Sequence, residues 1–237
     1  MVLTGSCPWP GPWSRSYGAH LQLQAREDPT PTAMAVPPTY RLAASLMNIA
    51  ESKEALRKEA LERRASLQPS VPDLSRRVAR SFLESIPIPK DAIVSAYFAI
   101  GDEADPAPLL EMLRAGGKRV ALPRVAGRGK PLDFHLYEEG AELVRGGFGL
   151  SEPSRDWPKV DPDVLAVPLL AFDGLGYRIG YGAGFYDRTL AKLRASKRVI
   201  AAGYAFSAQE FATIPHDEHD ERLDWIVTEL GARAFER

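Results

Sequence analysis

DGLGYRIGYGAGFYDR, residues 173–188, is the most informative segment of this chain for its fold. Its glycines stand at five positions: Gly174, Gly176, Gly180, Gly182 and Gly184. An apolar run, residues 164–172, comes before it, and residues 185–194 show a helical pattern. Glycine lets backbone N–H groups approach an anion, and a helix N-terminus adds partial positive charge. The order of strand, glycine-rich turn and helix therefore predicts an α/β fold with a phosphate cradle.

Charged side chains inside this stretch fit a nucleotide. Arg178 and Arg188 offer guanidinium groups to phosphate oxygens, and Asp187 offers a carboxylate to Mg²⁺. The glycines match neither common motif, because no lysine follows them as in Walker A and their spacing is too long for a dinucleotide fingerprint. A tightly turning structural loop is the alternative, and the two arginines with Asp187 favour phosphate binding over it.

The rest of the chain alternates between helical and strand patterns. Helices are predicted at residues 52–67, 73–84, 106–115 and 185–194, and strands at 92–99, 118–122, 132–136, 141–144, 164–170, 198–202 and 225–228. This alternation predicts a mostly parallel sheet with helices on both faces. Ligands of such sheets bind beyond the carboxyl ends of the strands, where the glycine-rich segment falls.

Length, net charge and cysteine content limit which partners and which cellular compartment we expect for this protein. The chain has 237 residues, a net charge of −1 and one cysteine, Cys7, so no internal disulfide can form. We expect small-molecule substrates, no nucleic acid, no membrane, a cytoplasmic location and a monomer. Residues 1–47 are proline-rich at first and lack a periodic pattern, which predicts a disordered N-terminal extension. Met34 or Met47 is an alternative biological start.

The glycine-rich segment resembles the signature of the 5-formyltetrahydrofolate cyclo-ligase family, and residues 167–168 and 172–173 belong to the same signature. Four other segments resemble motifs of that family: Lys53 to Arg57, residues 101–105, residues 146–153 and residues 219–229. The resemblance covers about residues 52–231 and implies a catalytic domain at 48–237. It implies a single three-layer α/β domain of the NagB/RpiA/CoA-transferase-like class.

The resemblance also implies a reaction and a set of site residues. The reaction is the cyclisation of 5-formyltetrahydrofolate to 5,10-methenyltetrahydrofolate with ATP and Mg²⁺, releasing ADP and phosphate. Arg178 and Lys53 would act in catalysis. The ATP-binding residues would be Lys53, Arg57, Arg178, Gly180, Tyr181, Gly182, Ala183, Gly184, Phe185 and Tyr186. The folate would contact Glu103, Phe98, Tyr137, Phe148 and Tyr186, and Asp187 and Asp224 would hold Mg²⁺.

Two positions depart from the family pattern. Ala183 stands where the family often has Lys or Gly, and Tyr137 stands where the family typically has a tryptophan near the pteridine. Two other functions remain open on the residues alone: a diverged nucleotide-binding member without folate turnover, and a sugar-phosphate or CoA sensor. The run 216–221, HDEHDE, is better explained as a solvated acidic turn than as a transition-metal site, because no third soft ligand is evident.

Overall fold

A computed structural model describes residues 48–67, 71–138, 141–146 and 151–236. The predicted disordered extension, residues 1–47, and the predicted folate contact Phe148 lie outside these ranges. Within them, one sheet has eight strands in the order β12-β11-β10-β7-β1-β2-β3-β6. The strands are β1 Ile93–Ser95, β2 Arg119–Arg124, β3 Asp133–Leu136, β6 Lys159–Val160, β7 Val164–Val167, β10 Ile200–Tyr204, β11 Trp225–Thr228 and β12 Gly231–Ala234.

The centre of the sheet is parallel and its edges are antiparallel. β1 pairs in parallel with β2 and β7, β7 with β10, and β10 with β11. β12 at one edge and β3 and β6 at the other run antiparallel to their neighbours. The predicted mixed α/β fold with a mostly parallel sheet is confirmed, whereas β12 and β6 were not predicted.

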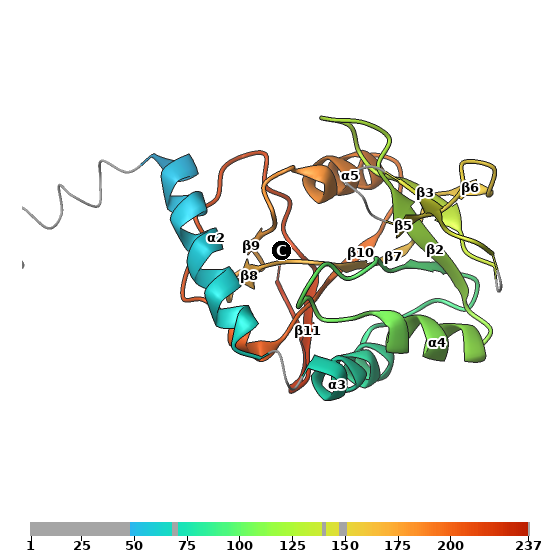
Figure 1. Cartoon of the computed structure of the whole chain (residues 1–237), viewed down its shortest axis with the longest axis horizontal. Coiled ribbons are helices and arrows are strands. Elements are labelled where there is room, and N and C mark those ends of the chain that lie inside the picture. The colour runs from blue at the N-terminus through green and yellow to red at the C-terminus, as the bar shows by residue number, and fades with distance from the viewer. Residues whose placement is uncertain (1–47, 68–70, 139–140, 147–150, 237) are drawn as a thin grey trace, which may run out of the picture.

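Helices cover both faces of the sheet (Figure 1). α3 Val71–Ser85 and α4 Ala107–Ala115 lie on one face, and α5 Phe185–Arg194 lies on the other. The side chains of β7 alternate between the two cores, as the pleat of a strand requires. Val164 and Ala166 pack on the side of α3 and α4, and Leu165 and Val167 pack on the side of α5.

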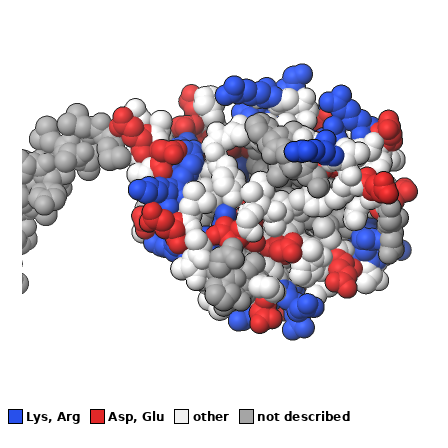
Figure 2. All heavy atoms as spheres, viewed as in Figure 1, with Lys and Arg blue, Asp and Glu red and all other residues white. Residues whose placement is uncertain are grey.

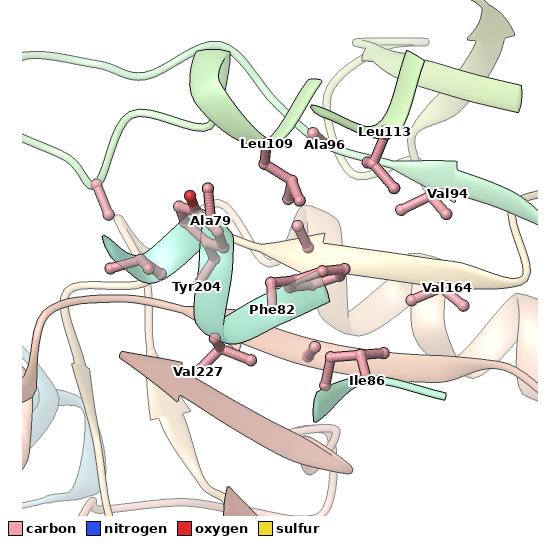
Figure 3. Close-up of a cluster of buried hydrophobic side chains, with 14 of the residues drawn as sticks. Ala79, Phe82, Ile86, Val94, Ala96, Leu109, Leu113, Val164, Tyr204 and Val227 are labelled. Carbon is pink, nitrogen blue, oxygen red and sulfur yellow. The ribbon is translucent and has the colours of Figure 1, made fainter. Parts of the chain in front are cut away.

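The core under α3 and α4 is built around one aromatic pair. Phe82 of α3 is fully buried, and its ring centroid lies 6.2 Å from that of Tyr204 at the end of β10. Leu109 and Leu113 of α4 close over the same cluster (Figure 3). The helices therefore present continuous apolar faces to the sheet, as the sequence periodicity predicts.

The strand predicted over 164–170 ends at Val167, because Pro168 has no backbone N–H to continue the ladder. The chain then forms a hairpin of β8 Ala171–Phe172 and β9 Arg178–Ile179. Asp173 Oδ1 accepts hydrogen bonds from the N–H groups of Leu175 and Tyr177 and fixes the hairpin turn. Gly174 and Gly176 therefore belong to this turn, and the phosphate cradle is confined to the later glycines.

α2 Ile49–Ala65 stands at one end of the sheet, beside the β8–β9 hairpin (Figure 1). It begins three residues before the predicted start, because Asn48 and Glu51 form a reciprocal capping box. Ala60 and Leu56 pack it against Leu170, Ala171, Ile179 and Ile214.

Acidic and basic side chains are interspersed over the face of the molecule shown in Figure 2. None of the described helices combines the length and the apolar character that crossing a bilayer requires.

Candidate active site

A pocket of about 520 Å³ opens beyond the carboxyl ends of β1, β2 and β7. Its walls come from α2, the turn after β1, the segment after β2, and the glycine-rich segment that leads into α5. Thirteen residues predicted for the site line it: Lys53, Arg57, Phe98, Glu103, Arg178, Gly180, Tyr181, Gly182, Ala183, Gly184, Phe185, Tyr186 and Asp187. The structure thus brings together segments more than a hundred residues apart in sequence.

Two residues predicted for the site do not line this pocket. Tyr137 follows β3 and packs beside Trp157, with a ring-centroid distance of 5.8 Å, while Arg114 lies over its ring. Asp224 precedes β11, where its Oδ2 accepts hydrogen bonds from Arg194 Nη2 at 3.0 Å and from the N–H of Ala201 at 2.8 Å. These contacts of Tyr137 and Asp224 are with other parts of the protein outside the pocket lining.

The glycine-rich segment shapes the anion-binding end of the pocket. Gly184 precedes α5 with φ +64°, and as a glycine it offers no side chain to cap that helix. A helix N-terminus presents N–H groups and partial positive charge, which suit an anionic oxygen. Gly182 has φ +93°, and a Cβ there would lie 3.2 Å from the Arg57 guanidinium. Both positions need glycine, for backbone conformation and for close approach.

Two cations from α2 flank these glycines. Arg57 Nε donates to the carbonyl oxygen of Gly180 at 3.1 Å, and Arg57 Nη1 pairs with Glu54 at 2.7 Å. Lys53 Nζ lies 2.8 Å from Asp217 Oδ2 and 2.5 Å from Asp220 Oδ2. Burial opposes the charge on Lys53, but the two carboxylates outweigh it and raise its pKa above the ordinary value. Lys53 therefore stays cationic across the physiological range.

Arg178 reaches the pocket from β9. Its side chain is nearly buried, Nη2 lies 2.6 Å from Asp187 Oδ1, and Nη1 donates to the carbonyl oxygen of Glu221. These contacts fix the guanidinium in one orientation. Asp187 in turn accepts from the N–H of Glu221 and lies in the first turn of α5.

Five aromatic side chains line the pocket: Tyr97, Phe98, Tyr181, Phe185 and Tyr186. The Tyr186 hydroxyl is buried and has no hydrogen-bond partner within the described ranges of the chain. Burial raises the pKa of this phenol far above its ordinary value. It is therefore a neutral group that can donate a hydrogen bond to a ligand.

Glu103 is the buried acid of the pocket, with 4 % of its surface exposed. Its Oε2 accepts from the N–H of Ile100 at 2.8 Å within the turn after β1. Burial raises the pKa of Glu103 to about 7, and the Ile100 N–H and the positive charge of Arg64 oppose that rise. The carboxyl group therefore titrates near neutral pH, as is common for groups that bind or move protons in active sites.

Sequence reasoning missed Arg64 and Asp220. Lys53, Arg57 and Arg64 are spaced by 4 and 7 residues, which places them on one face of a helix. The structure turns this face toward the protein and leaves the apolar Leu61 exposed. Asp220 lines the pocket and lies in the same carboxyl-terminal segment as the predicted Asp224. The spacing of the α2 cations was the signal that could have found Arg64.

Two carboxylates near the glycine-rich segment could hold a magnesium ion. Asp187 and Asp220 both line the pocket beside the glycine-rich segment, whereas Asp224 does not. No group of three or more potential metal ligands occurs among the residues that the structure describes. Proteins commonly hold Mg²⁺ through one or two carboxylates together with substrate phosphates.

The fold and the site define an α/β protein whose pocket combines a glycine-rich segment and cationic side chains with apolar surface. The sequence profile of the 5-formyltetrahydrofolate cyclo-ligase family matches residues 49–229. The chain belongs to this family of ligases of folate one-carbon metabolism.

Relatives and solved structures agree with this assignment. The 5-formyltetrahydrofolate cyclo-ligase of Mycolicibacterium smegmatis is 36 % identical over 75 % of this chain and 93 % of its own length. That of Escherichia coli K12 is 35 % identical over 70 % of this chain and 94 % of its own. The 5,10-methenyltetrahydrofolate synthetase of Aquifex aeolicus has a similar structure, with a TM-score of 0.66 and 33 % identity over 78 % of this chain and 93 % of its own.

Proposed function

We propose that this protein uses ATP to close 5-formyltetrahydrofolate to 5,10-methenyltetrahydrofolate, releasing ADP and phosphate. The observation that carries the proposal is the position of Glu103, which lines the same pocket as the glycine-rich segment and its cations. One pocket can therefore hold the phosphates of ATP against the formyl group of a folate. The NagB/RpiA/CoA-transferase-like class, the monomeric state and the cytoplasmic location stay predictions.

The chemical difficulty lies in the formyl oxygen, which is a poor leaving group from an amide-like carbon. Transfer of the γ-phosphoryl group to that oxygen gives an imidate phosphate and ADP. N10 of the folate then attacks the formyl carbon and gives up its proton to solvent or to the departing phosphate, and the C–O bond breaks to release inorganic phosphate. Positioning and neutralisation of charge supply most of the catalysis in such transfers.

The residues divide between the two substrates. The N–H groups of Gly180, Gly182 and Gly184 would cradle the phosphates, next to the positive charges of Lys53, Arg57 and Arg178. The remaining residues of the cradle that line the pocket, Tyr181, Ala183 and Phe185, would border the nucleotide.

On the folate side, Glu103 would bind the pterin or the N10 region, and Phe98 and Tyr186 would offer apolar surface to the ring. Tyr137 does not line the pocket, and its predicted folate contact stays a prediction. When bound, Mg²⁺ would supply Lewis-acid charge at the phosphate oxygens, held by Asp187 and Asp220.

A direct assay tests the proposed function. The protein is mixed with Mg·ATP and 5-formyltetrahydrofolate, and formation of the methenyl product is followed by its ultraviolet absorbance. ATP-dependent growth of that band supports the proposal. Bound ATP without product would instead favour a nucleotide sensor.

The assignment of magnesium ligands makes a separate prediction. Asp187→Asn is expected to raise the Mg²⁺ concentration needed for half-maximal rate by about tenfold, the effect of losing roughly 1.4 kcal/mol of a charged contact. Asp224→Asn is expected to lower the melting temperature without moving the Mg²⁺ requirement, because Asp224 holds Arg194 and the Ala201 N–H. Mg²⁺ titrations of both variants measure the difference, and a shift confined to Asp224→Asn would contradict the assignment.

A further inference from the structure

Arg64 is a fully buried cation that the proposed reaction has not used. It lies near the end of α2 with only 1 % of its surface exposed. A charge at such depth is retained only when other groups pair with it. The partners of Arg64 come from two other segments of the active site.

The first partner segment is the acidic turn after β1. Arg64 Nε donates to Asp102 Oδ1 at 2.8 Å, and Nη2 also lies 2.8 Å from that oxygen. Nη1 lies 3.9 Å from Glu103 Oε1. Nη1 has no hydrogen-bond partner among the described residues. Arg64 therefore holds one carboxylate of the turn directly and places an open N–H group beside the other.

The second partner segment is the glycine-rich segment. Arg64 Nη2 lies 2.8 Å from the Tyr181 hydroxyl, and the Tyr181 ring is half-exposed at the pocket. One guanidinium thus contacts both the part of the site assigned to ATP and the part assigned to folate. A planar fork with fixed donor directions can do this, whereas a lysine ammonium of the same charge cannot reach the same set of partners.

We propose that Arg64 is a positioning residue that ties the acidic turn to the glycine-rich segment and holds Glu103 in place as a carboxylate. The proposal rests on the proposed function, because it assumes that Glu103 contacts the folate. It assigns Arg64 no contact with either substrate.

The groups around Glu103 agree with this role. Three neutral phenols lie around Glu103: Tyr97 just after β1, Tyr181 of the glycine-rich segment and Tyr186 of α5. Asp102, in the same turn as Glu103, is acidic. Among these neighbours, Arg64 is the one positive charge. Loss of that charge should therefore favour the protonated form of Glu103, in the direction expected when an opposite charge within about 4–6 Å is removed.

The test compares pH profiles of kcat/KM for 5-formyltetrahydrofolate in the wild-type protein, Arg64→Met, Arg64→Lys and Arg63→Met. Arg63 is the neighbouring arginine, partly exposed, and it pairs with Glu59. We expect Arg64→Met to move the acidic limb upward by about one pH unit or more. A rise of one unit gives roughly a fivefold loss at pH 7, which approaches tenfold at lower pH and shrinks as the pH rises. Arg64→Lys should move the limb less, and Arg63→Met should leave it unchanged.

A second measurement does not depend on activity. The titration of Glu103 is followed by ¹³C NMR of carboxyl-labelled glutamate, with its signal assigned by its absence in Glu103→Gln. An upward shift of the midpoint in Arg64→Met supports the proposal. Tyr181→Phe, which removes one hydroxyl and keeps the ring, serves if Arg64→Met does not fold, and it should shift the midpoint in the same direction.

The outcomes separate the two proposals. A wild-type protein without cyclisation at any pH would overturn the proposed function. An active wild-type protein whose Arg64 variants lose the same fraction of rate at every pH, with an unmoved Glu103 titration, would overturn the positioning role and leave Arg64 a structural residue.

Discussion

Glu103→Gln is expected to give a protein that is more stable than the wild type at pH 8 and at least about 10²-fold less active. The gain in stability follows from the pKa of Glu103, which burial raises from 4.5 to about 7 in the folded protein. Between these pH values the folded state binds more protons than the unfolded state, so stability falls as the pH rises. Glutamine carries no charge and escapes that loss.

Ionisation of the buried Glu103 lowers the free energy of unfolding of the wild-type protein by about 3 kcal/mol. This loss is complete above pH 7 and absent below about pH 4.5. Denaturant unfolding of the wild type and the variant at pH 4 and pH 8 measures it. Glu111→Gln, on the exposed face of α4, is the matched control and should change neither stability nor activity. An equal stability difference at both pH values would contradict the burial of an ionisable Glu103.

The activity of Glu103→Gln falls for a different reason. Glutamine keeps an oxygen that can accept from the Ile100 N–H, so the turn after β1 should keep its shape. It offers no charge to the folate, and hydrogen bonds to charged groups contribute about 1.5–3 kcal/mol. A variant that is both more stable and inactive would show that the buried carboxylate is retained for function.

Arg178→Ala is expected to lower kcat/KM for ATP by about 10²-fold, the loss of one charge-assisted contact of roughly 2–3 kcal/mol. The side chain is nearly buried, and Asp187 and the carbonyl of Glu221 hold its guanidinium in place at the pocket. The free protein therefore already presents the charge to the nucleotide, without a further loss of side-chain freedom on binding.

Steady-state kinetics with ATP varied at saturating folate measure the effect. Arg178→Lys should recover only part of the activity, because an ammonium group cannot contact Asp187 and Glu221 in the same geometry. Arg233→Ala is the control, since Arg233 is exposed on β12 and pairs with Glu210 at the surface. Unchanged kinetics of Arg178→Ala would remove Arg178 from the site.

The sequence predicted the parallel centre of the sheet well, because buried strands such as β7 are continuous apolar runs. It did not predict the β8–β9 hairpin, since Phe172 extends the apolar run past Pro168 and hides the break. The edge strand β12 was missed as well. Its residues are only partly buried and lack the apolar signal that marks the central strands.

In the site, the residues inside the glycine-rich segment could be placed from the sequence because backbone conformation dictates their type. Tyr137 and Asp224 could not, because their orientation depends on which face of a strand end meets the pocket. Arg64 was hidden for another reason. Its spacing from Lys53 and Arg57 places it on the same helix face, but its burial depends on contacts with Asp102 and Tyr181, which lie far away in the sequence.

The position of α2 bears on how the protein loses activity as it begins to unfold. This helix supplies Lys53, Arg57 and Arg64 to the site, but its apolar contacts are with the small cluster around Ile179 and not with the two main cores. A segment with few buried apolar contacts can detach while the rest of the fold persists. Mild denaturant should therefore inactivate the enzyme before the sheet unfolds, and the amides of α2 should exchange hydrogen earlier than those of β7.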